Sequence, residues 1–131
     1  MFKFIECMRR SVMKLSLPFL KSSKASQIQN IYSDTVYSLY QAQDKDTVFI
    51  DVREAFEWRE GIIPGALKIS LSELSGKIHS LDPNLNYVLV CRSGNRSLTA
   101  ARMLEKAGFT QLSNFQGGMM AWQQKRYPLS K

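Results

Sequence analysis

A short apolar segment that ends in a cysteine, a polar loop and a helical pattern constrains this chain more than any other feature. Residues 87–90 (Tyr-Val-Leu-Val) read as a buried strand, Cys91 follows directly, and a loop with two arginines leads into helical spacing at 97–106. A strand followed by a helix is the unit from which parallel sheets are built, so the pattern predicts an α/β fold. It also places Cys91 at the carboxyl end of a strand, where open α/β sheets carry their active sites.

The same alternation extends along the chain. Strands are predicted near residues 29–32, 47–52, 66–69 and 111–115, in addition to 87–90. Helical segments are predicted to begin near Ser33 or Asp34, near Ala55, at Ser72, at Ser97 and after Gly117-Gly118. Strands that alternate with helices favour one α/β domain with a parallel sheet.

The length and the charge distribution indicate one domain with a basic extension. A chain of 131 residues with 44% hydrophobic content is long enough for one core and too short for two. Residues 1–26 carry six lysines and arginines against one acidic residue, a net of +5, so the rest of the chain holds only +2 of the total +7. We therefore divide the chain into an extension at 1–26 and a domain at 27–131, and we expect no nucleic-acid surface on the domain.

The extension leaves two interpretations open. Apolar residues at Phe2, Ile5, Met8, Val12 and Leu15 recur at three- and four-residue steps between basic residues, which is typical of an amphipathic helix on an anionic membrane surface. The alternative is a flexible or loosely docked tail. No apolar run approaches the ~20 residues of a transmembrane helix, so any membrane contact is expected to be peripheral and made through residues 1–20.

The cysteine and histidine content limits the chemistry. Only two cysteines are present, Cys7 in the extension and Cys91 in the domain, which disfavours a disulfide framework and suits a reducing compartment, the cytoplasm. We expect neither a metal site, since no Cys/His cluster has ligand spacing, nor a cofactor. The single histidine, His79, lies in a predicted amphipathic helix and is expected on the surface, which counts against a Cys-His hydrolase.

Cys91 is the candidate nucleophile. The alternative interpretation is a small buried hydrophobe, a common environment for a free cysteine. Loop amides, the start of a helix, and two arginines, Arg92 and Arg96, favour the thiolate instead. The same arginines are candidates for holding an anionic ligand, and Arg96, at the helix start, is the preferred one.

Three blocks of this sequence resemble rhodanese-like domains. Asp51-Val52-Arg53-Glu54 with the segments 56–58 and 61–66 is similar to the first block of that family, residues 91–97 (Cys-Arg-Ser-Gly-Asn-Arg-Ser) resemble its active-site loop, and residues 117–122 resemble its closing block. The match covers about residues 28–128. The family often has a histidine where Ile62 stands, and a glycine shortly before the last proline, where this chain has Lys125-Arg126-Tyr127.

The resemblance implies a single domain with a five-stranded parallel sheet flanked by helices, and sulfurtransferase activity. Cys91 would take a sulfane sulfur from a donor such as thiosulfate or a persulfide, become a persulfide, and pass the sulfur to a thiophilic acceptor. The implied partners are a small-molecule donor and a thiol acceptor, or a protein persulfide; the oligomeric state is left open. Asp51 and Arg53 are expected to support the site as a charge network. The residues implied to cradle the sulfur are Arg92, Ser93, Gly94, Asn95, Arg96 and Ser97.

Two other functions remain open for this loop. The first is a phosphatase or arsenate reductase. Protein tyrosine phosphatases and their rhodanese-like relatives resemble one another in a loop with five residues between cysteine and arginine, whereas four residues separate Cys91 from Arg96. The shorter loop favours a sulfur atom over a tetrahedral oxyanion. A non-catalytic rhodanese-like binding module is the second alternative, although such modules usually lack the loop cysteine.

Overall fold

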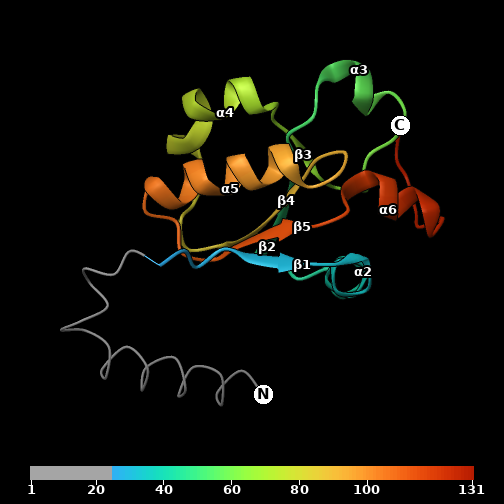
Figure 1. Cartoon of the computed structure of the whole chain (residues 1–131), viewed down its shortest axis with the longest axis horizontal. Helices are drawn as coiled ribbons and strands as arrows, with labels where there is room; N and C mark the ends of the chain where they lie inside the picture. The colour runs from blue at the N-terminus through green and yellow to red at the C-terminus, as the bar shows by residue number, and fades with distance from the viewer. Residues whose placement is uncertain (1–24) are drawn as a thin grey trace, which may run out of the picture.

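The computed structural model describes residues 25–131. A five-stranded parallel sheet forms its centre, with strand order β1-β5-β4-β2-β3 (Figure 1). The strands are β1 (Gln29–Ile31), β2 (Thr47–Asp51), β3 (Leu67–Lys68), β4 (Asn86–Val90) and β5 (Leu112–Phe115). The helices are α2 (Ser33–Ala42), α3 (Ala55–Trp58), α4 (Leu71–Lys77), the 3₁₀ turn η1 (Ile78–Ser80), α5 (Asn95–Lys106) and α6 (Gly118–Gln124). The predicted α/β fold with five parallel strands is confirmed.

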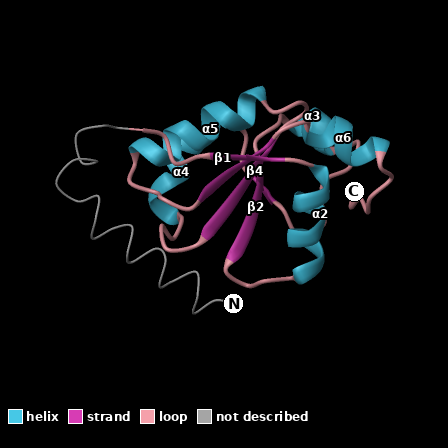
Figure 2. Cartoon of the chain, turned by 60° about the horizontal axis from the view of Figure 1, so that its bottom comes forward, coloured by secondary structure: helices cyan, strands magenta, loops and turns pink. Residues whose placement is uncertain are grey.

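Helices cover both faces of the sheet (Figure 2). On one face, Leu74 of α4 and Leu104 of α5 pack against Leu89 of β4 in the larger core cluster. On the other face, Val36 of α2 and Trp122 of α6 pack in a second cluster that also holds alternate residues of β4. The strand therefore contributes Tyr87 and Leu89 to one core and Val88 and Val90 to the other, as the two-residue period of a strand dictates.

This double burial explains why the 87–90 segment is apolar throughout. All four of its side chains are at most 2% exposed, which is typical of a parallel strand with helices on both sides. The edge strands are short instead. β1 has three residues, and β3 has two residues that are both exposed. Only a strand in the interior of the sheet could carry such a sequence, so β4 and the cysteine after it lie in the middle of the fold.

The register brings the end of β4 beside the end of β2. Asp51 pairs with Val90, and the amide of Val52 then donates to the Val90 carbonyl at 2.8 Å. Residues that follow the two strands, among them Arg53 and Cys91, therefore emerge at the same edge of the sheet. This edge positions the site described below.

Three predicted helix boundaries are wrong by one or two residues. The helix predicted from Ser97 begins at Asn95, because Gly94 adopts φ +118° as its N-cap and turns the chain two residues earlier. The helix predicted from Ser72 begins at Leu71, because Ser70 and Glu73 form a reciprocal capping box. The first helix includes Ser33 and Asp34 rather than being capped by them, since its N-cap is Tyr32.

The C-terminal turn forms without the glycine that the family often has there. Arg126 takes a left-handed conformation at φ +57°, and Tyr127 then stacks on Tyr37 with ring centroids 3.9 Å apart. The indole of Trp122, which is 0% exposed, donates to the Pro128 carbonyl at 2.7 Å. The missing glycine thus leaves the turn intact, with some backbone strain at Arg126.

Within residues 25–131, no helix has the length and apolar character needed to cross a bilayer. The expectations for the extension, including Cys7 and the contact through residues 1–20, concern residues before 25 and lie outside the described part of the chain. The first described residues lie against the domain, since the Gln27 amide donates to the Glu105 carboxylate at 2.7 Å.

Candidate active site

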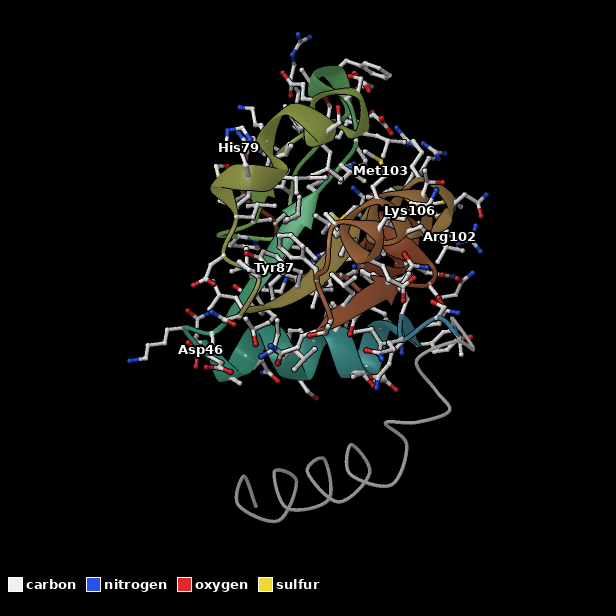
Figure 3. The ribbon with its side chains drawn as sticks, turned by 90° about the vertical axis from the view of Figure 1, so that its left-hand side faces the viewer. Asp46, His79, Tyr87, Arg102, Met103 and Lys106 are labelled. Carbon is white, nitrogen blue, oxygen red and sulfur yellow. The ribbon has the colours of Figure 1, made fainter. Side chains whose placement is uncertain are left out.

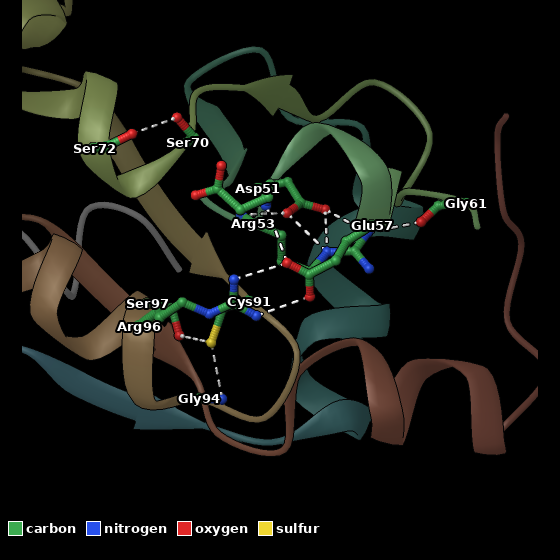
Figure 4. A network of polar contacts seen from close by, with 11 residues as sticks. Asp51, Arg53, Glu57, Gly61, Ser70, Ser72, Cys91, Gly94, Arg96 and Ser97 are labelled. Carbon is green, nitrogen blue, oxygen red and sulfur yellow. Dashed lines mark hydrogen bonds and ion pairs between the residues drawn. The ribbon is translucent and has the colours of Figure 1, made fainter. Parts of the chain in front are cut away.

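Cys91 lies at the carboxyl end of β4, at the base of the loop that leads into α5 (Figure 4). Its side chain belongs to the larger core cluster and is 1% exposed, so the interpretation as a buried residue describes its environment correctly. The polar contacts of its sulfur are what set it apart from a core hydrophobe.

The loop wraps its polar groups around the sulfur. The Gly94 amide donates to Cys91 Sγ at 3.1 Å, and Ser97 Oγ lies 3.3 Å from the same atom. Burial raises the pKa of the Cys91 thiol, but hydrogen bonds from Ser97 Oγ and from the amides of Ser97, Gly94 and Ser93 outweigh it, so the pKa is lowered. The loop therefore favours the thiolate, which is the nucleophilic form of cysteine.

On one side of the sulfur lies a network of uncharged side chains, Ser97, Asn114 and Asn30, which we call the neutral side. Ser97 Oγ donates to Asn114 Oδ1 at 2.5 Å, and Asn114 Nδ2 donates to Asn30 Oδ1 at 3.0 Å and to the Gly94 carbonyl at 3.2 Å. Ser97 and Asn114 are both 0% exposed. The neutral side thus ties the loop to β5 and β1.

The other side holds four charged residues, Asp51, Arg53, Glu57 and Arg96, which we call the charged side. Arg96 donates to both carboxylate oxygens of Glu57, at 2.8 and 2.9 Å, across 39 residues of sequence (Figure 4). The hydrogen bond from Arg96 lowers the pKa of Glu57 to about 2. A bidentate pair of this kind fixes the direction of the guanidinium, and here it joins α5 to α3.

Asp51 and Arg53 form the deeper part of the charged side. Arg53 Nη2 lies 2.9 Å from Asp51 Oδ2 and also donates to the Gly61 carbonyl at 2.8 Å. Both side chains are at most 2% exposed. The pair thereby holds the segment after α3 against the end of β2, and it forms the charge network that the sequence predicted for these two residues.

The start of α6 holds the backbone of the Cys91 loop. The amides of Met119 and Met120 donate to the carbonyls of Cys91 and Arg92 at 2.8 and 3.0 Å. Gly118 permits this approach, because a Cβ at that position would clash with the Cys91 carbonyl oxygen and with the Arg92 backbone. Gly118 of the closing block is therefore needed to fit α6 against the loop.

The predicted loop residues have different environments. Gly94 and Ser97 contact the sulfur, whereas Arg92, Ser93 and Asn95 are exposed. Arg96 is paired with Glu57 rather than unpaired, so an anionic ligand would share its guanidinium with that carboxylate. Its role as the preferred anion-holding residue stays a prediction.

Sequence reasoning missed three residues of the site. Glu57 lies inside the first block and Gly118 inside the closing block, so both were in view, but nothing in their spacing shows which partner they meet. Asn114 lies in a predicted strand. The property that marks it as a site residue is that a polar side chain is 0% exposed, and burial cannot be read from the sequence.

Residues remote from the loop complete the picture. His79 is exposed on η1, as predicted (Figure 3). Among residues 25–131, no three His, Cys, Asp or Glu side chains are close enough together to hold a metal ion.

Comparison with known proteins agrees with this geometry. The model of the rhodanese-like domain family matches residues 35–125. The chain belongs to the rhodanese-like family. That span runs from α2 through α6 and contains the whole charged side, together with the Cys91 loop and Asn114.

Relatives of this rhodanese-like domain carry related names. YtwF of Bacillus subtilis, named provisionally as a sulfurtransferase, is 41% identical over 65% of this chain and 82% of its own length. A Schizosaccharomyces pombe mitochondrial protein, named provisionally as a thiosulfate sulfurtransferase, is 31% identical over 93% of this chain and 96% of its own.

One similar solved structure belongs to a protein with a different candidate activity. The Rhodopseudomonas palustris protein RPA3614, described as of unknown function and as a candidate tyrosine phosphatase, aligns with a TM-score of 0.73 at 25% identity. The alignment covers 90% of this chain and 93% of that one. The fold is thus shared with a protein described as a candidate tyrosine phosphatase.

Proposed function

We propose that this protein is a sulfurtransferase that carries sulfane sulfur as a persulfide on Cys91. One observation supports this most directly: the sulfur atom accepts a hydrogen bond from the Gly94 amide and contacts Ser97 Oγ inside a closed loop, with no histidine near it. A thiolate maintained by such contacts needs no general base to attack sulfur.

The reaction has two displacements. The Cys91 thiolate attacks the outer sulfur of a donor, the bond between that sulfur and the rest of the donor breaks, and sulfite leaves if the donor is thiosulfate. A second thiolate then attacks the outer sulfur of the Cys91 persulfide, and the Cys91 thiolate leaves with the bonding electron pair. Loop amides stabilise the charge on Cys91 before and after each step.

A phosphatase function is less consistent with the charged side. A phosphate ester needs the loop arginine to bind its oxygens bidentately, and Arg96 directs one N–H of each of its two Nη atoms to Glu57 instead. With four residues between Cys91 and Arg96, the loop offers little space for a tetrahedral group. Because RPA3614 is described as a candidate tyrosine phosphatase, turnover of a phosphate ester should be measured alongside sulfur transfer.

Mass spectrometry after treatment with thiosulfate, polysulfide or glutathione persulfide tests the proposal. We expect a gain of one sulfur mass on Cys91 that is lost on addition of a thiol acceptor. The adduct should be absent from Cys91→Ser and present in Cys7→Ser, which is the matched control. If no donor yields an adduct, the protein is a binding module; turnover of a phosphate ester without sulfur transfer would make it a phosphatase.

A further inference from the structure

The orientation of the Asn114 amide is fixed by its neighbours. Its Nδ2 faces three acceptors, namely the Gly94 carbonyl at 3.2 Å, Asn30 Oδ1 at 3.0 Å and Gln116 Oε1 at 3.5 Å. Its Oδ1 therefore faces Ser97 Oγ, at 2.5 Å. An amide oxygen can only accept, so the Ser97 hydroxyl is the donor in this contact.

A count of protons then decides the contact between Ser97 and Cys91. A serine hydroxyl has one proton, and here that proton is on the Asn114 side. The 3.3 Å contact to Cys91 Sγ must then use the thiol proton, with Ser97 Oγ as the acceptor. This arrangement suits a neutral Cys91.

A thiolate cannot keep this arrangement, because Cys91 then has no proton to donate and its charge faces a lone pair of Ser97. Rotation of the hydroxyl toward the sulfur removes the conflict, but it leaves Asn114 Oδ1 without a donor at a site that is 0% exposed. We propose that the Ser97 hydroxyl switches between two acceptors, Asn114 and Cys91, and that Asn114 is a positioning residue that holds this proton until the thiolate forms.

The switch of the Ser97 hydroxyl does not depend on the proposed function, but the role of that switch in sulfur transfer rests on it. In the persulfide, the inner sulfur carries neither proton nor charge, so the hydroxyl returns to Asn114. The Ser97 proton would then stabilise the Cys91 thiolate when it acts as a nucleophile or as a leaving group. It would return to Asn114 when Cys91 carries the persulfide. Asn114 therefore makes the free thiolate harder to form, although it never touches the sulfur.

The charged groups around Cys91 stay constant in the test. They are Arg96 of α5, Glu57 of α3, and Asp51 and Arg53 at the end of β2 (Figure 4), together with the exposed Arg92, which follows Cys91 in the loop. The neutral side contains no titratable group, since it consists of Ser97, Asn114 and Asn30. Variants of Asn114 thus change the hydrogen bonding of Cys91 without changing any charge.

The ultraviolet absorbance of the thiolate, followed against pH without any sulfur donor, gives the pKa of Cys91 in the full chain carrying Cys7→Ser. Asn114→Leu keeps the branched shape but offers no acceptor, and Asn114→Ala is the smaller alternative. We expect both to lower the pKa of Cys91 by about 0.5–1 unit, or about 3- to 10-fold in the ratio of thiolate to thiol. An unchanged or raised pKa in the folded variants would overturn the switch, because a merely structural Asn114 would loosen Gly94 and raise the pKa.

Two further variants identify the route of the effect. In a Ser97→Ala background, Asn114→Leu should no longer lower the pKa, because the shared proton is gone; an undiminished decrease would refute the role of the hydroxyl. Asn30→Ala removes a partner of Asn114 Nδ2 and should leave the pKa unchanged. Since no donor is present, failure here is distinct from failure to form a persulfide, and near-ultraviolet circular dichroism verifies that each variant is folded.

Discussion

The two sides of the Cys91 loop are built from different chemistry. The charged side contains two ion pairs, one fully buried between Asp51 and Arg53 and one between Glu57 and Arg96, whose Arg96 side chain is 35% exposed. The neutral side reaches the sulfur itself through Ser97. Both sides hold the loop in place, but only the uncharged hydrogen bonds of the neutral side reach the sulfur atom.

The largest expected effect is on the buried pair. Arg53→Leu leaves the Asp51 carboxylate without its partner at 1% side-chain exposure and should lower the free energy of unfolding by about 3–5 kcal/mol, measured by urea denaturation. Combining it with Asp51→Leu should restore part of the loss, since no buried charge remains. If the double variant were no more stable than Arg53→Leu, the loss would come from packing rather than charge.

Ser97→Ala tests the neutral side in the same assay. It leaves Asn114 Oδ1 buried without a donor, which should cost about 1–3 kcal/mol of unfolding free energy. Ser93→Ala is the matched control, because Ser93 is exposed, and it should stay within about 0.5 kcal/mol of the parent. Equal effects at the two serines would contradict the stated importance of the neutral side.

Glu57→Gln should have a smaller effect. The glutamine oxygen can still accept from the Glu54 amide, so the change removes mainly the charge of the pair with Arg96. We expect a loss of about 1 kcal/mol that diminishes at high salt, because Arg96 is partly exposed. Glu60→Gln, an exposed carboxylate without an ion pair among the described residues, should change stability little under the same conditions.

The pH dependence of Glu57 gives the finest test. Its pKa in the folded protein, about 2, lies below the ordinary value of 4.5, so the folded state binds its proton less readily than the unfolded state. The stabilisation is therefore complete above about pH 4.5 and should be lost as the pH falls toward 2. Urea denaturation between these values should show the parent approaching Glu57→Gln, and a constant difference would contradict the assignment.

The sequence predicted the part of the site that is contiguous in the chain. An apolar strand, a cysteine and a loop can be read along a few residues, so Cys91, its strand and the following helix were all placed correctly. The early start of α5 was missed because Gly94 acts as an N-cap through a positive φ rather than through a side chain.

The partners that act on the loop from a distance were not predictable. Arg96 was expected to hold an anionic ligand because its charge is visible, whereas its direction depends on Glu57, 39 residues away. Asn114 is separated from Ser97 by 17 residues and reaches it only because β5 pairs with β4. Such contacts depend on strand order and register, which a single sequence does not reveal.

The parallel pairing of β1 with β5 has a consequence for the newly made protein. Asn30 and Asn114 hydrogen-bond across 84 residues of sequence, and the α6 amides that hold the Cys91 carbonyl come later still. Synthesis proceeds from the N-terminus, so the ribosome adds Cys91 before Asn114 and before the Met119 and Met120 amides that hold the loop. On an unfinished chain this cysteine is an ordinary thiol, and it gains its special environment only when the last strand and helix are in place.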